Sequence, residues 1–371
     1  MGCVEMKMPA AVHALGVLLL FATTAWADDT AGSAGNIAES LGVRAAPQPV
    51  RERAGWRAPK LILVNARLHE QMEVLRAAAP GVTFVEANMA TPAQVAKADA
   101  TIGVCTPEVL AHASHLQWIQ WLGAGVEACV REPKLREGNV LLTNMQSAAG
   151  PSMAEHVLGM MLVLSRHLDY YVKQQQQAHW ADDSPALADL SGKTVLIVGL
   201  GGIGTEVAKR AHAFGMRVIA TRASGRTGPD YVSYVGLPEE LLKLTPDADF
   251  VVNCSPLTPQ TTAIFNAGYF AAMKPGAYFL NVGRGRSVVT ADLVAALTAG
   301  RVAGAGLDVV DPEPLPESSP LWHLPNVIIT PHISAYTAMT MQQRDVLLRE
   351  NLKRFVAGDP LIAVVDIERG Y

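Results

Sequence analysis

Residues 194–210 read TVLIVGLGGIGTEVAKR, and the order of residue types in this stretch decides the fold. The apolar run 195–198 predicts a strand, the glycines after it predict a turn, and the apolar spacing beyond them predicts a helix. Gly199 permits the tight turn, Gly201 lets the backbone approach a pyrophosphate, and Gly204 lets the helix pack on the strand. The first turn of such a helix offers unpaired amides to phosphate. The stretch therefore predicts a dinucleotide-binding loop, and the alternative is an ordinary strand-to-helix turn. The predicted contact residues are Gly199, Gly201, Gly202, Ile203 and Gly204.

The end of the next predicted strand bears on the choice of dinucleotide. Sites for NAD usually have an acidic residue there, which hydrogen-bonds the ribose hydroxyls. Residues 216–226 read MRVIATRASGR and contain no acid. An arginine in this place can pair with a 2′-phosphate through its planar fork. We therefore expect NADP(H) in preference to NAD(H), bound by Thr221, Arg222 and Ser224. The alternative is that Arg222 stacks on adenine or faces solvent.

The first 27 residues have the organisation of a secretory signal peptide. Lys7 precedes an apolar run over residues 10–21, and AWA at residues 25–27 resembles a cleavage site. The run is short for a membrane span, so we expect the mature form to be exported to the periplasm without a membrane segment. Residues 28–59 are rich in Ala, Gly, Ser and Pro and are expected to form a flexible leader. The alternatives are an uncleaved anchor, or a misassigned start codon and a cytoplasmic protein.

Charge and cysteine content argue against several classes of protein. The formal net charge is −4 and no basic tract occurs, so a nucleic-acid partner is not expected. The mature chain would keep Cys105, Cys129 and Cys254. This odd, widely spaced set predicts neither a disulfide framework nor a metal site, and each cysteine is expected to be a small buried apolar side chain. No histidine pair has metal-ligand spacing with a carboxylate partner, so no metal is expected.

Apolar strands alternate with helices on both sides of the glycine motif, which predicts doubly wound parallel sheets. The expected fold class is α/β, with two Rossmann-like domains and an active-site cleft between them. The substrate domain is predicted over residues 60–151 and is completed by residues 337–371, with a last strand at 363–366. The dinucleotide-binding domain is predicted over residues 152–336. Ligands of such sheets bind at the carboxyl ends of the strands.

Three segments beyond the glycine motif place polar residues directly after apolar strands. They are NVGRG at residues 281–285, GLDVVDPEP at 306–314 and TPHIS at 330–334. Together with NCSPLTPQT at residues 253–261 and LGAGVE at 122–127, this long pattern resembles the D-isomer-specific 2-hydroxyacid dehydrogenase family. Within the family the pattern resembles the glyoxylate/hydroxypyruvate reductase and phosphoglycerate dehydrogenase group, and the resemblance runs from about residue 61 to residue 363.

The resemblance implies a catalytic set of Arg284, Glu313 and His332. A histidine suits proton transfer to a carbonyl oxygen because its pKa is near neutral. A carboxylate beside it favours the charged ring and fixes its orientation, and an arginine can bind the substrate carboxylate and polarise the carbonyl. The resemblance also implies that Asp308 touches the nicotinamide amide, with a cap at the strand end as the alternative. The further cofactor contacts that it implies are Cys254 and Pro256.

Residues 122–127 match the substrate loop of the family. The amides of Gly123, Ala124 and Gly125 are expected to bind the substrate carboxylate together with Arg284. The family usually has Asp where Glu127 stands, a change that we expect to affect a helix cap more than the chemistry. His156 lies in the helix that follows the first domain, and a structural role is expected for it.

These features predict an NAD(P)-dependent oxidoreductase that transfers a hydride between nicotinamide and a small 2-keto acid or D-2-hydroxy acid. The family resemblance also implies a homodimer. Free nicotinamide cofactor is scarce outside the cytoplasm, so the alternative is an exported protein that binds a dinucleotide or metabolite without turnover. The presence of arginine, glutamate and histidine in the catalytic pattern argues against that alternative, because a binding protein does not need the set.

Overall fold

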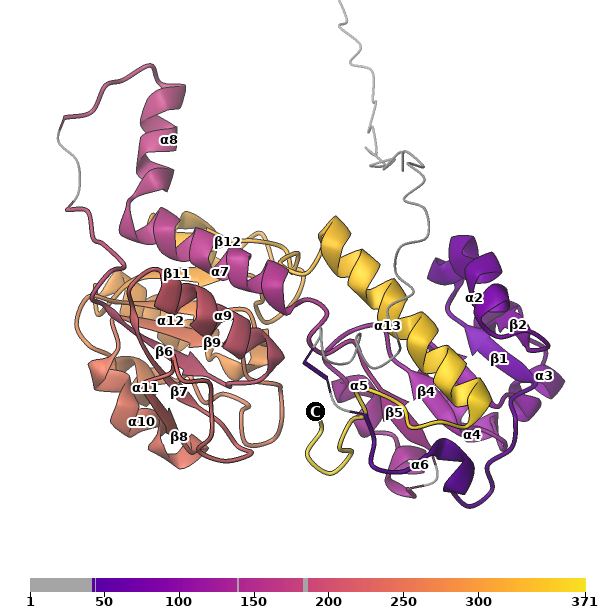
Figure 1. Cartoon of the computed structure of the whole chain (residues 1–371). Coiled ribbons are helices and arrows are strands. Elements are labelled where there is room, and N and C mark those ends of the chain that lie inside the picture. The colour runs from indigo at the N-terminus through magenta and orange to yellow at the C-terminus, as the bar shows by residue number, and fades with distance from the viewer. Residues whose placement is uncertain (1–41, 44, 139, 183–185) are drawn as a thin grey trace, which may run out of the picture.

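Two parallel sheets covered by helices form the two lobes of the molecule (Figure 1). The computed structural model describes residues 42–43, 45–138, 140–182 and 186–371. The predicted signal peptide, residues 1–27, lies outside the described residues. The α/β fold class with two Rossmann-like sheets is confirmed, whereas the residue bounds of the two domains stay a prediction.

The first lobe has a five-stranded sheet in the order β2-β1-β3-β4-β5, in which all adjacent strands are parallel. The strands are short, and all except the partly exposed edge strand β2 are largely buried, as expected of a parallel sheet that helices cover. Its strands are β1 (Leu61–Val64), β2 (Thr83–Glu86), β3 (Ala100–Ile102), β4 (Trp118–Gln120) and β5 (Leu141–Thr143). Its helices are α2 (Met72–Ala78), α3 (Pro92–Lys97), α4 (Pro107–His112), α5 (Glu127–Val130) and α6 (Pro133–Arg136).

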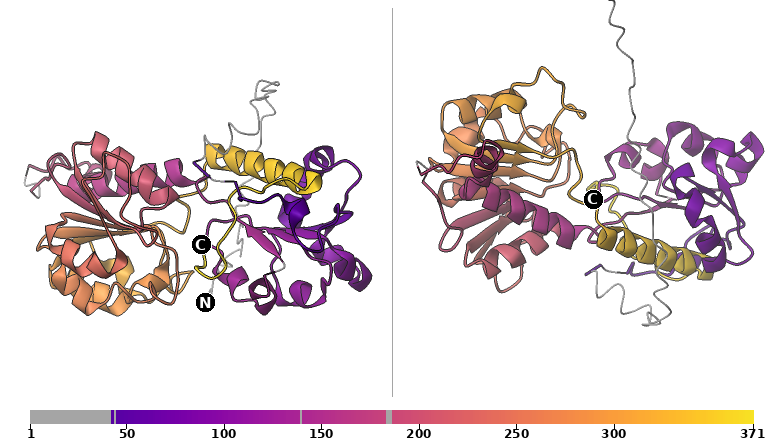
Figure 2. Two further views of the ribbon diagram at one scale, coloured as in Figure 1. Left: turned by 60° about the horizontal axis from the view of Figure 1, so that its bottom comes forward. Right: turned by 90° about the horizontal axis from the view of Figure 1, so that it is seen from above.

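The long C-terminal helix α13 (Ala338–Ala357) returns to the first lobe and packs in its core (Figure 2). The rings of Phe355 and Trp118 lie 4.8 Å apart. Asn351 is buried among apolar groups, where its amide bonds the side chain of Gln120 at 3.0 Å and the backbone of Ile362. Because these bonds satisfy its polar atoms, Asn351 ties the C-terminal segment to β4.

The second lobe has a seven-stranded parallel sheet in the order β12-β11-β10-β9-β6-β7-β8. Its strands are β6 (Thr194–Val198), β7 (Arg217–Thr221), β8 (Tyr234–Gly236), β9 (Phe250–Asn253), β10 (Ala277–Asn281), β11 (Val302–Leu307) and β12 (Val327–Ile329). Its helices are α7 (Gly150–Ser165), α8 (Leu168–Gln176), α9 (Gly202–Ala213), α10 (Leu241–Leu244), α11 (Ala267–Ala272) and α12 (Thr290–Thr298). The strand order reverses between β9 and β6, which is where ligands bind in such folds.

Helices α7 and α8 are separate elements, although only two residues lie between them. His167 takes a left-handed conformation with φ of +48° between them. Helix α7 packs on α9 and on the second sheet, whereas α8 projects away from the body of this lobe (Figure 1). On and just beyond α8, the side chains of Leu168, Val172 and Trp180 are exposed at 45%, 52% and 89%.

The predicted flexible leader differs from the structure over its last part. From Ala45 onward the segment packs on the first lobe: Ala45 bridges Ile362, and Val50 is buried in the core. Arg57 then pairs with the carboxylate of Asp99, which is 2% exposed. The partners of this segment are remote in sequence, so local composition carried no signal of the packing.

Two strand expectations also differ from the structure. Residues 363–366 form no strand and make only an isolated bridge between Val364 and Thr143. Strand β8 at the sheet edge was not expected from the sequence. Among the helices of the described chain, none has the length and apolar character needed to cross a membrane.

Candidate active site

The glycine motif forms the turn between β6 and α9 as its residue types require. Gly199 has φ of +97°, and a Cβ there would lie 2.9 Å from the backbone of Ser255. A Cβ on Gly204 would lie 2.2 Å from the carbonyl oxygen of Gly199, so only glycine lets α9 pack this closely on β6. Gly201 has open space around it and stands immediately before the first turn of α9. The turn thus leaves room for a phosphate beside the helix N-terminus.

The predicted cofactor and catalytic residues line up along one edge of the second sheet. Because all seven strands are parallel, their carboxyl ends share this edge. Cys254 and Pro256 follow β9, and Arg222 follows β7. The segments after β10, β11 and β12 carry the three residues of the predicted catalytic set, Arg284, Glu313 and His332 respectively. The edge therefore runs from a catalytic end at β12 to a nucleotide end at β7.

At the nucleotide end, two hydrogen bonds fix the side chain of Arg222. Its Nε donates to the Ser224 hydroxyl at 2.8 Å, and its Nη1 donates to the Thr227 carbonyl oxygen at 2.9 Å. Arg226 points elsewhere, because its guanidinium pairs with Glu240 at 2.6 Å and contacts the hydroxyl of Tyr234. Arg222 is therefore the cation that this loop keeps in place at the strand end, next to the Ser224 hydroxyl.

At the catalytic end, His332 and Glu313 form a hydrogen-bonded pair. His332 Nδ1 lies 2.9 Å from Glu313 Oε2, and both side chains are partly exposed. The other carboxylate oxygen of Glu313 accepts from the backbone N–H of Val310 at 3.1 Å. A carboxylate only accepts hydrogen bonds, so Nδ1 of His332 donates, and Nε2 makes no hydrogen bond within the described chain. This arrangement suits a group that delivers and takes up a proton.

Asp308 holds the loop that carries this histidine. The carboxylate is 1% exposed. It accepts from the hydroxyls of Thr330 and Ser334 and from the backbone of Ile333 and Ser334. Burial by itself would raise the pKa of Asp308, but these hydrogen bonds outweigh it and the pKa lies below its usual value. The geometry is that of the cap at the strand end, and contact with the nicotinamide stays a prediction.

His156 supports the same loop from α7. Its Nε2 lies 3.0 Å from the Thr330 hydroxyl and 3.8 Å from Asp308 Oδ1. His332 itself adopts φ of +54°, a left-handed conformation that few residues other than glycine take, and its N–H donates to the Asp308 carbonyl oxygen at 2.8 Å. The hydrogen bonds to the buried Asp308 stabilise this backbone conformation.

Arg284 faces the predicted substrate loop. A Cβ on Gly125 would lie 1.4 Å from Arg284 Nη2, so the guanidinium packs directly on this glycine. The carbonyl oxygens of Gly123 and Ala124 accept from the segment after β5, from Met145 N–H and from the Asn144 amide. In the described chain, the N–H groups of residues 123–125 donate no hydrogen bond. Unpaired amides beside an arginine form a setting suited to a carboxylate.

Glu127 also contacts Arg284, and the sequence did not predict this contact. The expected effect on a helix cap is wrong, since α5 has no side-chain cap and the Glu127 carboxylate instead accepts from Arg284 Nε at 2.9 Å. The signal available in the sequence was the glutamate in place of the usual aspartate of the family. Its longer side chain reaches the other lobe.

The expectation for two of the cysteines is also wrong. Cys105 and Cys129 are buried, as expected, but they form a disulfide, with Cα atoms 5.6 Å apart. The bond links the turn after β3 to α5, directly after the substrate loop. Twenty-four residues separate the two cysteines, and only the sheet order β3-β4 brings their segments together. Cys254 is a free, half-buried thiol.

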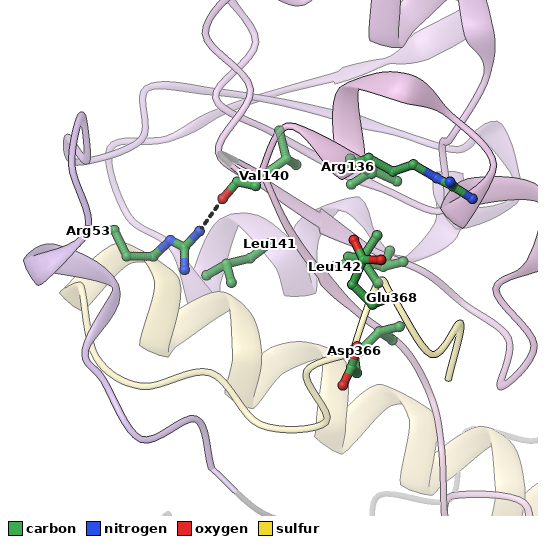
Figure 3. Close-up of a pocket in the computed structure, with 11 residues that line it drawn as sticks. Arg53, Arg136, Val140, Leu141, Leu142, Asp366 and Glu368 are labelled. Atoms are coloured by element: carbon green, nitrogen blue, oxygen red, sulfur yellow. Dashed lines mark hydrogen bonds between the residues drawn. The ribbon is translucent and has the colours of Figure 1, made fainter.

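The pocket in Figure 3 is separate from the candidate active site. It lies at the periphery of the first lobe, between α6, β5 and the C-terminal residues 365–368. Figure 3 shows Arg53 and Arg136 on opposite sides of it, with Glu368 and Asp366 below Arg136 in this view. None of the predicted site residues lines it. Within the described residues, no group of three or more His, Cys, Asp or Glu side chains is placed to hold a metal ion.

Comparisons with known proteins identify a family for the chain. Residues 158–334 match the family described as D-isomer specific 2-hydroxyacid dehydrogenase, NAD binding domain. Glyoxylate/hydroxypyruvate reductase A of Photorhabdus laumondii is 34% identical over 269 residues, which are 71% of this chain and 84% of the relative.

Two solved structures are similar over most of the chain. One is a D-isomer specific 2-hydroxyacid dehydrogenase of Xanthobacter autotrophicus in complex with NADPH, with 30% identity, a TM-score of 0.72 and coverage of 85% of this chain and all of the other. The second is an NADPH-dependent glyoxylate/hydroxypyruvate reductase of Sinorhizobium meliloti in complex with NADP and sulfate, with 30% identity and a TM-score of 0.72. It covers 84% of this chain and all of the other.

The fold and the edge of polar residues define an oxidoreductase that uses a nicotinamide cofactor. The similarity in sequence extends over most of the chain and over most of the relatives. The chain belongs to the D-isomer-specific 2-hydroxyacid dehydrogenase family.

Proposed function

We propose that the protein reduces glyoxylate, hydroxypyruvate or a similarly small 2-keto acid with NADPH. The observation that carries the proposal is the convergence of two groups at one sheet edge. The first is the paired His332 and Glu313, and the second is Arg284 packed on the unpaired amides around Gly125. One group supplies a proton and the other binds a carboxylate. A substrate with adjacent carboxylate and carbonyl groups needs both.

The residues of this chain divide the reaction between them. The nicotinamide cofactor supplies the hydride for the carbonyl carbon. The amides of residues 123–125 and the guanidinium of Arg284 orient the carboxylate, and Arg284 stabilises the negative charge that develops on the carbonyl oxygen. His332 Nε2 delivers the proton to that oxygen, and Glu313 stabilises the ring in its charged form. The oxidation of a hydroxy acid uses the same groups in reverse.

The residues of the glycine turn fit a dinucleotide. A Cβ on Gly202 would lie 2.8 Å from the Ser147 hydroxyl, so the chain enters α9 close to the segment before α7. Ile203 follows in the first turn of α9, and Thr221 is buried at the end of β7. Together with Gly201 and Arg222, these residues would hold the pyrophosphate and the adenosine ribose.

The direct test is oxidation of NADPH and NADH by purified protein beginning at Asp28, with glyoxylate and hydroxypyruvate as acceptors. We expect turnover with both acids and a lower KM for NADPH than for NADH. A folded protein that binds NADPH but turns over neither acid would instead support a binding function without catalysis.

The preference for NADPH can be tested at Arg222. The substitution Arg222→Asp removes the cation at the strand end and places a carboxylate where a 2′-phosphate would lie. Hydrogen bonds to charged groups contribute about 1.5–3 kcal/mol, so we expect the Kd for NADPH to rise about 10- to 100-fold. The Kd for NADH should stay the same or fall. Both constants can be measured by titration calorimetry.

Arg217→Asp provides the matched control for this test, because Arg217 is exposed at the opposite end of the same strand. It should leave both Kd values unchanged. Equal losses of NADPH affinity in the two variants would show that general charge, and not a specific contact of Arg222, attracts the phosphate.

We further propose that the protein is exported to the periplasm. Support comes from the signal-like residues 1–27 and from the disulfide between Cys105 and Cys129, because disulfides persist in oxidising compartments and are rare in the cytosol. Fractionation of cells that express the full chain should place a processed protein in the periplasm. An unprocessed protein in the cytoplasmic fraction, with all its thiols reactive, would contradict export.

We also propose a homodimer in which α8 packs against a second copy. The exposed apolar side chains of Leu168 and Val172 on this projecting helix support the proposal, because an isolated helix needs a partner for such a face. Light scattering on the purified protein should give twice the monomer mass. Leu168→Glu combined with Val172→Glu should shift it to the monomer mass, and a monomeric wild-type protein would contradict the proposal.

A further inference from the structure

One ion pair connects the two lobes at the candidate active site. Arg284 follows β10 in the second lobe, and Glu127 begins α5 in the first lobe. Arg284 Nε lies 2.9 Å from Glu127 Oε1, and the two side chains are 28% and 20% exposed. A pair that is mostly shielded from water is screened less by salt than a surface pair. It can therefore hold its partners in a defined geometry.

The guanidinium of Arg284 is fixed on three sides. Glu127 accepts from Nε, and the Gly283 carbonyl oxygen accepts from Nη1 at 2.7 Å. The third nitrogen, Nη2, lies against Gly125, where a Cβ would be 1.4 Å away. No acceptor in the described chain contacts Nη2. Because the guanidinium is planar and rigid, fixing two nitrogens sets the direction of the third.

The direction of Nη2 matches the place where a carboxylate would bind. The N–H groups of residues 123–125 make no hydrogen bonds in the described chain, and Nη2 packs on the same loop. Glu127 follows this loop directly and belongs to the same lobe. The residue that holds Arg284 in place thus moves with the amides that complete the carboxylate site.

We propose that Glu127 is a positioning residue for Arg284. Its carboxylate aims the unpaired Nη2 at the substrate loop, and it does so only when the two lobes are together. The arginine therefore reaches its working orientation when the loop amides are also in reach. This inference rests on the proposed reduction of a 2-keto acid, because it names a residue that acts through Arg284 in that reaction.

The charge and the hydrogen bond of Glu127 have opposite effects on a substrate. The hydrogen bond orients Arg284, whereas the negative charge repels an incoming carboxylate. A glutamine can still accept from Nε through its amide oxygen but carries no charge. An alanine removes both effects. The two substitutions therefore separate orientation from charge.

Steady-state kinetics of the full mature protein with NADPH and glyoxylate test the proposal. A misplacement of about 1 Å can cost on the order of 100-fold in rate, so we expect Glu127→Ala to lower kcat about 10- to 100-fold. Glu127→Gln should keep kcat close to that of the wild type and should lower the KM for the keto acid. The Kd for NADPH and the Tm should stay unchanged in both.

The exposed Glu137, at the end of α6 in the same lobe, provides the matched control. Glu137→Ala should leave kcat and KM unchanged. Unchanged kcat in Glu127→Ala, or an equal loss of kcat in Glu127→Ala and Glu127→Gln, would overturn the positioning role. A wild-type protein that turns over no keto acid would contradict the proposed function instead, so the two failures are distinguishable.

Discussion

Replacement of His332 by asparagine is expected to lower kcat about 100- to 10,000-fold, the usual contribution of a positioned acid–base group. Asparagine is chosen because His332 has φ of +54°, and asparagine tolerates this left-handed conformation better than alanine does. The variant should therefore keep the loop geometry while it loses the proton donor that Glu313 orients at 2.9 Å. Stopped assays with hydroxypyruvate and NADPH measure the loss.

The control for this prediction is His323→Asn, because His323 is an exposed histidine in the 3-10 helix Pro320–His323. This variant should retain wild-type kcat. In His332→Asn the Kd for NADPH should not change, because the nucleotide end of the site lies at β7. A kcat near that of the wild type in His332→Asn would rule out the proposed proton transfer.

Arg284→Lys is expected to lower kcat/KM for glyoxylate about 100- to 1,000-fold, although the charge is kept. Lysine offers a point charge and cannot reproduce the planar fork that contacts Glu127, Gly283 and the surface of Gly125 at the same time. Both the binding of the carboxylate and the stabilisation of the developing negative charge should suffer. The loss should therefore occur in KM and in kcat.

The neighbouring Arg286 allows a matched control, since it is exposed in the 3-10 helix Gly285–Ser287. Arg286→Lys should have little effect on either constant. A loss in Arg284→Lys that is confined to KM would mean that Arg284 binds the substrate without stabilising the transition state.

Local residue patterns were sufficient to predict much of the fold. The apolar run at 195–198 and the glycines after it form β6, the turn and α9 as expected, because a tight turn and a close helix contact each require glycine at one defined position. Buried parallel strands read as short apolar runs wherever they occur. The places of the polar segments after β10, β11 and β12 were predicted in the same way. A polar residue that directly follows a short apolar strand lies at the carboxyl edge of the sheet.

Contacts between distant segments were not predictable in this way. The pairing of Cys105 with Cys129 depends on the adjacency of β3 and β4, and cysteine spacing alone suggested no bond. The packing of residues 45–59 depends on partners far away in the sequence, such as Ile362 for Ala45 and Asp99 for Arg57. The hydrogen bonds around Asp308 could not be predicted either, because nothing in the sequence distinguishes Thr330 and Ser334 as its partners.

By itself, the sequence determined the fold class, the dinucleotide turn and the three segments that carry Arg284, Glu313 and His332. Each depends on residues within about one strand and one turn of one another, so local pattern is enough. Only the tertiary structure decided that Glu127 meets Arg284 across the two lobes, 157 residues apart. It also decided that Asp308 supports the His332 loop. The distance between such groups is set by how two sheets and their helices pack, and no local pattern encodes that packing.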